Sequence, residues 1–406
     1  VEFAGLDIIA FLIAMMIVVG FLEDNHFFEY VIDRLLSWVG PHPKKLIIVM
    51  MIMAAVSAAL VDEVTSILFM TAIMLNLITD EQGKSRINPI PFIMMLVFTT
   101  NIGSSATVVG NPVGVIIALR SGLTFFDFLW WATPISILCV AMTIPICLKL
   151  FAKDIRALKG VLTGRKGTKH LEDMLEEDAA KAKKGIRQSA WLFGAVILGL
   201  VLHHPIEHWL GLARNTMLLG VALFGAGAAL TISGTKARDL VDRRVDWWTL
   251  AFFLFLFASV GTLKQMGVTS VIANTIIELS RGSVPLLTTL FAWSSGALTA
   301  VMDNVLAIAT FVPIVADVGA SGLQTFPLWW AMLMGGTLMG NATLIGSTAN
   351  IVAAGLLERR KVGEITFAQW LAPGLLIGVS TLVLANLIIL ARLPWMPAAV
   401  AMPAAH

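Results

Sequence analysis

The chain has 406 residues, of which 58% are hydrophobic and 13% are charged, and its mean hydropathy is +0.86. These values lie outside the range of soluble domains, and the net charge of +2 is too small to indicate a nucleic-acid partner. Apolar runs of about twenty residues recur along most of the chain, so the sequence predicts an all-α, polytopic membrane protein in a lipid bilayer. The chain begins with Val1 rather than methionine and shows no signal peptide, and the sequence leaves open whether residues upstream of Val1 are missing.

The apolar segments and the charged loops divide the chain into four regions. We expect a first transmembrane repeat at 1–150, a charged cytoplasmic loop at 151–189, linking helices with a basic loop at 190–244, and a second transmembrane repeat at 245–406. The first repeat begins with the span Leu6–Leu22 and an interfacial helix at Phe27–Val39, and Val268–Leu279 takes the place of this interfacial helix in the second repeat. In the linking region, the spans Trp191–Leu202 and Met217–Ile232 flank a short turn. The basic loops on either side of this pair predict that the turn lies outside.

Two short apolar runs, Leu46–Leu60 and Ile67–Ile78, meet at Asp62 and Glu63. Each run is marginal for crossing a bilayer alone. This pattern favours a re-entrant helical hairpin with its polar tip inside the membrane, although one long helix whose carboxylates face a bundle interior would also give it. Ionisable groups at membrane depth are costly and indicate function, whereas carboxylates at the membrane surface would be unremarkable.

The next apolar span, Ile90–Leu119, is interrupted by Asn101–Asn111, a stretch rich in Gly, Ser, Thr and Asn that ends at Pro112. Small residues also serve tight helix packing, but packing alone does not explain two asparagines and a proline. The composition favours a discontinuous helix, because non-helical backbone at membrane depth is tolerated where it is buried or lines a watery cavity. Half-helix ends at such a break can bind an ion or a solute.

The second half of the chain repeats this pattern. Asp303 and Asn304 correspond to Asp62 and Glu63 at an offset of 241 residues, and Gly340–Asn350 corresponds to the first break at an offset of 236. Such a small slip over this distance is typical of a duplicated unit. Because Glu63 matches Asn304, the two halves differ by one charge, and this difference could set how many protons or cations accompany each substrate.

The candidate site residues come from these four stretches. We expect proton or cation coupling at the three carboxylates, Asp62, Glu63 and Asp303. We expect substrate binding by Asn101, Ser104, Ser105, Thr107, Asn111, Asn304, Asn341, Thr343, Ser347 and Asn350. No catalytic residue and no metal ligand is predicted, because the sequence contains no phosphate-loop, zinc-protease or serine-hydrolase motif.

One cluster of metal-binding residue types falls outside these stretches: His203, His204, Glu207 and His208. Pro205 interrupts the helical pairing of His204 with His208. We therefore interpret the cluster as part of the outside turn between the linking spans, and not as a metal site.

The motifs resemble those of the ion transporter superfamily. Acidic tips followed by Ala-Thr-hydrophobic-hydrophobic-Gly breaks, here at 106–110 and 342–346, are similar to one branch of it. That branch holds arsenite permeases, NhaD-type sodium–proton antiporters and the pigment-cell P protein, and is often labelled citrate-transporter-like. The resemblance covers nearly the whole chain. It implies two inverted repeats, each with a re-entrant hairpin and a discontinuous helix, in a homodimer that works by an elevator-like movement.

The hairpin tips depart from those of the superfamily's dicarboxylate transporters, which carry Ser-Asn-Thr and bind sodium and substrate there. Here the tips read Asp62-Glu63-Val64 and Asp303-Asn304-Val305. An anionic substrate would face two or three carboxylates, with no Lys or Arg evident nearby. This departure favours a cation, or a neutral solute exchanged for protons.

We therefore predict an ion-coupled secondary transporter of the inner membrane, not an enzyme. The leading hypothesis is proton-coupled efflux of arsenite or antimonite, since arsenous acid is mostly uncharged at neutral pH and a polar cage could hold it. No cofactor is expected beyond the coupling ion, H⁺ or Na⁺, and arsenite systems can include an accessory ATPase. The alternatives are a sodium–proton antiporter, a transporter of carboxylates or other anions, and a passive channel.

Overall fold

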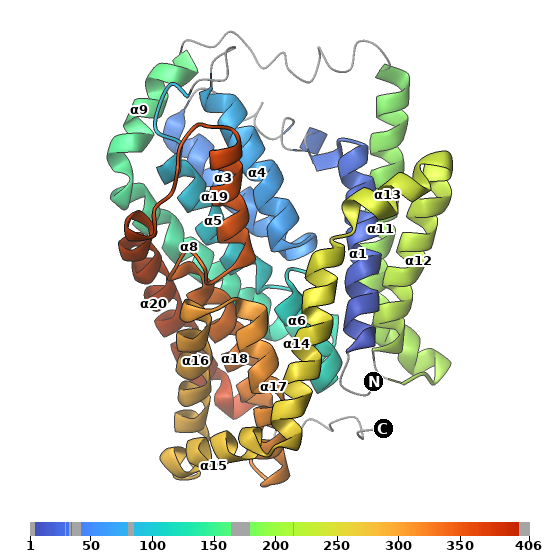
Figure 1. Ribbon diagram of the computed structural model, residues 1–406, viewed down its shortest axis with the longest axis vertical. Coiled ribbons are helices and arrows are strands. Elements are labelled where there is room, and N and C mark those ends of the chain that lie inside the picture. The colour runs from blue at the N-terminus through green and yellow to red at the C-terminus, as the bar shows by residue number, and fades with distance from the viewer. Residues whose placement is uncertain are drawn as a thin grey trace.

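The computed structural model describes residues 5–28, 30–31, 34, 42–79, 85–163, 179–213 and 215–397 of the chain. The regular elements within these ranges are all helices, and eight of them are long and apolar enough to cross a membrane (Figure 1). The predicted all-α, multi-pass architecture is therefore confirmed.

The first hairpin and the first break are formed by helices α3 (Pro43–Leu60), α4 (Glu63–Ile78), α5 (Ile90–Ser104) and α6 (Pro112–Ser121). The chain leaves the helical conformation at Val61–Asp62, and α3 packs against α4. The segment is therefore a helical hairpin and not one long helix. The stretch between α5 and α6 is non-helical, which confirms the predicted discontinuous helix. We call α3–α6 the first set.

The second set has the same order of elements: α16 (Val284–Val301), α17 (Asn304–Ala320), α18 (Phe326–Leu338) and α19 (Thr348–Arg359). A short 3₁₀ turn, Met339–Asn341, extends α18 before the second break. In Figure 1 the hairpin of the first set enters from one end of the molecule and the hairpin of the second set enters from the opposite end. Opposed directions of this kind are what an inverted repeat requires.

The two sets interlock through their half-helices. Half-helix α6 packs against α17 and α18, whereas half-helix α19 packs against α4 and α5. Each half-helix thus belongs to one set by sequence and packs against the hairpin of the other set. This exchange brings both hairpin tips and both breaks to one place in the middle of the molecule.

Glycine permits the closest helix packing in each set. A Cβ atom on Gly103 of α5 would lie 2.4 Å from the Cα atom of Ala55 in α3, and one on Gly335 of α18 would lie 2.3 Å from the carbonyl oxygen of Ala292 in α16. Helices in a bilayer associate through such small residues, because lipid tails supply no hydrophobic drive for association. Replacing either glycine would therefore push a hairpin arm away from its broken helix.

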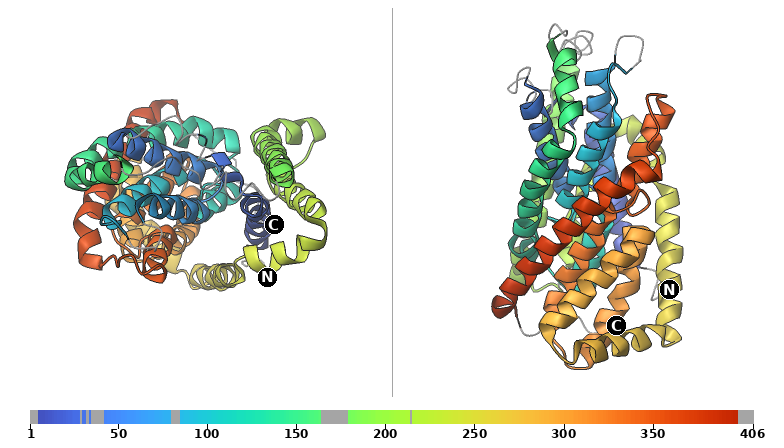
Figure 2. Two further views of the ribbon diagram at one scale, coloured as in Figure 1. Left: turned by 90° about the horizontal axis from the view of Figure 1, so that it is seen from above. Right: turned by 90° about the vertical axis from the view of Figure 1, so that its left-hand side faces the viewer.

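Five helices stand beside the interlocked sets, and we call them the peripheral group: α1 (Leu6–Asp24), α11 (Ala179–Leu210), α12 (Thr216–Ser233), α13 (Ala237–Arg244) and α14 (Trp247–Gln265). Helix α1 packs against the other four members. Viewed from above, the group lies along one side of the molecule (Figure 2). Helices α8 (Thr133–Leu150) and α20 (Phe367–Arg392) instead pack against each other and against the broken helices.

Two segments predicted as loops are helical. The predicted charged loop at 151–189 begins with helix α9, Ala152–Thr163, which buries Ile155 and Leu158 and packs against α3. Its charged and apolar residues alternate at helical spacing, a pattern that a count of charges overlooks. Helix α11 continues through Pro205 to Leu210, so the predicted turn beginning at His203 is also wrong. Residues 164–178 lie outside the described ranges.

The two predicted interfacial helices have different outcomes. Phe27–Val39 falls largely on residues outside the described ranges. Its counterpart at Val268–Leu279 is helix α15, Val268–Ser280, which confirms that prediction as a helix.

Candidate transport site

The two aspartates at the hairpin tips cap the helices that follow them. Asp62 Oδ1 accepts a hydrogen bond of 2.8 Å from the backbone N–H of Thr65, and Asp303 Oδ1 accepts one of 2.9 Å from the N–H of Val305. Thr348 also donates to Asp303 Oδ2, at 2.9 Å. Both carboxylates are partly exposed and lie at the positive ends of helix dipoles. The structure thus provides a structural role for both, and their predicted role in coupling stays a prediction.

Glu63, the first residue of α4, is the buried carboxylate between the two sets. Only 2% of the residue is exposed. Its Oε2 accepts a hydrogen bond of 2.9 Å from Ser104, and its Oε1 accepts contacts of 3.2 Å from Asn304 and 3.4 Å from Ser347. The donors come from α5, α17 and the N-terminus of α19, so residues of both sets converge on one side chain.

Glu63 and Asn304 are equivalent residues of the two hairpin tips, and they touch each other. Asn304 is 1% exposed, and its Nδ2 donates to Glu63, while its Oδ1 has no hydrogen-bond partner among the described residues. A buried polar atom without a partner is costly. The pair therefore offers two oxygens, one from each residue, to a bound group.

Four asparagine and serine side chains form a closed network beside Glu63. Asn101 Nδ2 donates to Asn341 Oδ1 and to Asn350 Oδ1, both at 2.8 Å, and its Oδ1 accepts from Ser347 at 3.1 Å. Asn341 Nδ2 in turn donates to the carbonyl of Phe98. Asn350 Nδ2 likewise donates to backbone carbonyls, those of Gly340 and Thr343, so the NH₂ groups of all three asparagines are occupied, and the bonds of Asn101 tie α5 to the second break.

Asn111 and Ser104 connect the first break to Glu63. Asn111 caps α6 by accepting from the N–H of Gly114 at 2.8 Å, and its Nδ2 donates to Ser104 Oγ at 2.8 Å. The one hydroxyl proton of Ser104 faces both Glu63 Oε2, at 2.9 Å, and the carbonyl of Asn101, at 2.8 Å. We refer to the residues that meet here as the central cluster: Glu63, Asn101, Ser104, Asn111, Asn304, Asn341, Ser347 and Asn350.

The other predicted binding residues point elsewhere. Thr107 donates to the carbonyl of Ala59, and Thr343 donates to the carbonyl of Ala300 at 2.7 Å, so these equivalent threonines bind the equivalent hairpin arms. Backbone groups freed inside a membrane protein need such partners. Ser105 Oγ lies 2.6 Å from Ser136 Oγ of α8. In this conformation Ser105, Thr107 and Thr343 do not join the central cluster.

Sequence reasoning missed three residues around the site: Ser136, Thr348 and Trp370. Trp370 Nε1 donates to the carbonyl of Asn341 at 2.9 Å, and the other two contact Ser105 and Asp303. Thr348 lies within the second break and could have been selected from the sequence. Ser136 and Trp370 lie in ordinary apolar spans, which carry no comparable signal.

The chemistry of the central cluster is that of oxygen and amide groups. Among the described residues, no three His, Cys, Asp or Glu side chains are arranged to hold a metal ion. The four stretches that supply the cluster contain no Lys, Arg or His. None of the three groups that donate to Glu63 carries a positive charge. Glu63 therefore either pairs with a bound cation when it is ionised or holds a proton and is neutral.

Broken helices, interlocked hairpins and a buried carboxylate at their junction define a multi-pass membrane transporter. The chain belongs to the citrate transporter family, whose sequence pattern matches residues 1–335. This match confirms the resemblance drawn from the motifs. The family and the relatives are transporters and not enzymes.

An uncharacterized transporter of Mycobacterium tuberculosis is 31% identical over 384 residues, which cover 93% of this chain and 84% of that protein. The human P protein is 24% identical over 89% of this chain and 51% of its own length. The crystal structure of the YdaH transporter of Alcanivorax borkumensis matches with a TM-score of 0.65 at 13% identity, over 99% of this chain and 88% of that one. At this identity the likeness supports the fold alone.

Proposed function

We propose that this protein is an ion-coupled secondary transporter whose coupling proton or cation binds at Glu63. The observation that carries the proposal is the burial of Glu63 between the two hairpin tips, with donors from both sets and no cationic partner among those donors. Buried ionisable groups of this kind in membrane proteins mark ion pathways and proton relays. Because Asn304 is neutral at the equivalent tip, we expect one exchangeable charge per protomer at the centre.

The leading substrate is arsenite or antimonite, carried out of the cell against a flow of protons. Arsenous acid is a small, neutral hydrogen-bonding solute, and Asn304 Oδ1 and the hydroxyls of Ser104 and Ser347 lie beside Glu63 to receive it. A neutral solute needs no compensating charge in the site. Proton release from Glu63 on one side and uptake on the other would couple the two movements.

Sodium–proton antiport is the second candidate, and one observation favours it. Glu63 Oε1 and the unpartnered Asn304 Oδ1 belong to adjacent side chains, and hard cations prefer oxygen ligands of this kind. In that mechanism Na⁺ and H⁺ would compete directly for Glu63. A bare citrate anion, suggested by the family description, fits less well, because no basic residue stands in the four stretches.

The wider setting follows from the resemblance. We expect a homodimer in the inner membrane that moves its central cluster across the bilayer by an elevator-like motion, with H⁺ or Na⁺ as the coupling ion and no other cofactor. In an arsenite system an accessory ATPase could join it.

The test is flux into proteoliposomes with an imposed pH gradient, for wild type and Glu63→Gln. Arsenite, sodium and citrate are compared one at a time. Gradient-dependent arsenite flux that disappears in the variant supports the leading proposal, whereas sodium-triggered proton movement without arsenite flux supports the antiporter. Citrate flux that survives in Glu63→Gln, or fast flux that ignores the gradient, would exclude both.

A further inference from the structure

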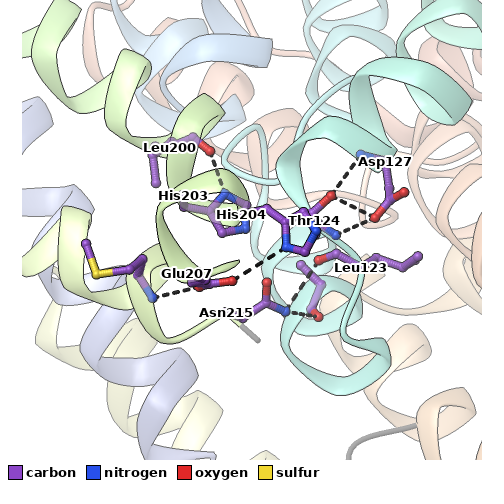
Figure 3. Close-up of polar contacts among 10 residues, drawn as sticks. Leu123, Thr124, Asp127, Leu200, His203, His204, Glu207 and Asn215 are labelled. Carbon is purple, nitrogen blue, oxygen red and sulfur yellow. Dashed lines mark hydrogen bonds and ion pairs between the residues drawn. The ribbon is translucent and has the colours of Figure 1, made fainter. Parts of the chain in front are cut away.

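The turn between α11 and α12 holds the far end of half-helix α6. Asn215 Nδ2 donates to the carbonyl of Ala118 at 2.8 Å and to that of Leu123 at 3.4 Å, and the residue is 6% exposed (Figure 3). The Ala118 carbonyl also accepts the backbone N–H of Gly122 at 2.9 Å, so the Asn215 amide adds a second hydrogen bond at the C-terminus of α6 and ties the residue after its C-cap, Leu123, to the same side chain. Its orientation follows from the two carbonyls, which accept only from the NH₂ end.

Glu207 fixes the position of that turn. Its Oε1 accepts the backbone N–H of Met217 in the first turn of α12 at 2.8 Å, and its Oε2 lies 3.9 Å from His204 Nδ1. Glu207 is 2% exposed and lies on α11, four residues beyond His203, where the turn was predicted to begin, so the helix itself carries the carboxylate to α12. We refer to Glu207 and Asn215 as the Asn215 clamp.

Half-helix α6 links this clamp to the central cluster. It has 10 residues and is therefore about 15 Å long. Its first turn is capped by Asn111, which donates to Ser104, which donates to Glu63. A displacement of α6 along its axis would move Asn111 directly, because a helix transmits such a shift as a rigid rod.

The equivalent half-helix α19 is anchored differently. Its C-terminal Arg360 donates to Asn76 of α4, in an exposed contact of 3.2 Å within the interlocked sets. Helix α6 instead reaches the peripheral group, through Asn215 and through an exposed pair between Arg120 and Asp7 of α1 at 3.4 Å. An exposed pair of this kind contributes little, so the buried Asn215 contact is the main polar tie.

We propose that Asn215 is a positioning residue for transport: held in place by Glu207, it fixes the axial position of α6 and thereby the place of Asn111 and Ser104 beside Glu63. This inference rests on the proposed role of Glu63. According to this proposal, the peripheral helices α11 and α12 determine the position of Asn111 and Ser104, the part of the central cluster that belongs to the first break.

The test compares Asn215→Gly with wild type. Glycine removes the amide and still accepts the left-handed backbone of this position, where φ is 60°. The matched control is Asn386→Ala, which removes another buried amide, bonded to Thr289 on α16 and remote from α6. Concentration-dependent flux of arsenite and of sodium in proteoliposomes gives KM and kcat, and hydrogen exchange reports the opening of Ser121–Thr124.

We expect Asn215→Gly to raise KM for the transported probe by about fivefold, the effect of losing about one hydrogen bond, with kcat changed less than about twofold and faster exchange at the end of α6. Glu207→Ala is the second variant if Asn215→Gly does not fold, and it should show the same split. Glu207→Gln keeps an acceptor for Met217 and should resemble wild type.

Faster exchange with an unchanged KM would overturn the inference, and so would equal KM changes in Asn215→Gly and Asn386→Ala. Unchanged exchange at the end of α6 would overturn it as well. The exchange measurement does not depend on the solute, so the absence of flux in the wild type would count against the proposed function and leave the clamp itself testable.

Discussion

The two hairpin tips are built alike and differ at one buried position. Each begins with an aspartate that caps the following helix, and each receives a threonine hydroxyl from the following break on an equivalent backbone carbonyl. The next residue is Glu63 in one tip and Asn304 in the other, and these two side chains touch. The comparison teaches that the features shared by both tips satisfy backbone groups, whereas the difference at this buried position places one carboxylate at the junction of the sets.

The largest expected effect follows from removing that carboxylate. Glu63→Gln keeps the size of the side chain and removes the charge, so a coupling proton or cation has no site. We expect gradient-driven flux in proteoliposomes to fall by at least about a hundredfold, equivalent to about 2.7 kcal/mol. Thermal unfolding provides the control, since the variant should remain folded. Flux within about threefold of wild type would remove Glu63 from the mechanism.

A swap of the two residues tests whether the tips are interchangeable. In the double variant Glu63→Asn with Asn304→Glu the carboxylate moves to the second tip, where the neutral partner again lies beside it. We expect flux within about tenfold of wild type, as expected where two coupled positions compensate each other, while Glu63→Asn alone is inactive. A double variant as inactive as the single one would mean that the donors around Glu63, and not the charge alone, are essential.

Substitutions of Asp62 and Asp303 can distinguish a helix-capping role of these carboxylates from a role in ion coupling. Asparagine caps a helix about as well as aspartate, whereas alanine costs about 1 kcal/mol. If Asp62 and Asp303 act only as caps, Asp303→Asn and Asp62→Asn should lower flux by less than about threefold, and the alanine variants should lower the thermal midpoint. Loss of the pH-gradient dependence in either asparagine variant would instead support the coupling role that the sequence predicts for these residues.

Much of this architecture was predictable, because polar residues inside apolar runs carry a cost that only structure or function explains. That logic predicts both hairpins and both breaks from the sequence alone, and it selects Glu63 and Asn304 as candidate site residues. It could not separate residues that bind one another or the backbone from residues that face the centre. Asn101, Asn341 and Asn350 are such a case, since their mutual bonds arise only when α19 packs against the other set.

The errors have a common physical origin. The prediction that Pro205 interrupts the helical pairing of His204 with His208 is wrong, because α11 continues through it. Membrane helices tolerate proline because neighbouring groups satisfy the freed carbonyl. For the same reason the sequence does not predict the contact of Glu207 with Met217 of α12, which depends on a helix long enough to reach α12. The prediction of a loop at 151–189 rests on its many charged residues, although the apolar residues Ile155 and Leu158 of α9 are buried and α9 packs against α3. In both cases the local sequence is polar or contains proline, but packing against another helix, α12 for α11 and α3 for α9, determines that the segment is helical.

The smallest expected effect concerns the two equivalent threonines. Thr107→Val and Thr343→Val keep the shape of the side chain and leave the carbonyls of Ala59 and Ala300 without a donor, which costs about 1 kcal/mol each. Because the two hydrogen bonds are equivalent, both variants should lower the thermal midpoint by similar amounts, and the double variant should add the two effects. Flux should fall together with stability and not further. A large loss of flux in Thr107→Val alone would show that the first break binds solute in a way that the second break does not. The first break leads into half-helix α6, which the Asn215 clamp holds. The asymmetry between the two tips would then extend to the two breaks.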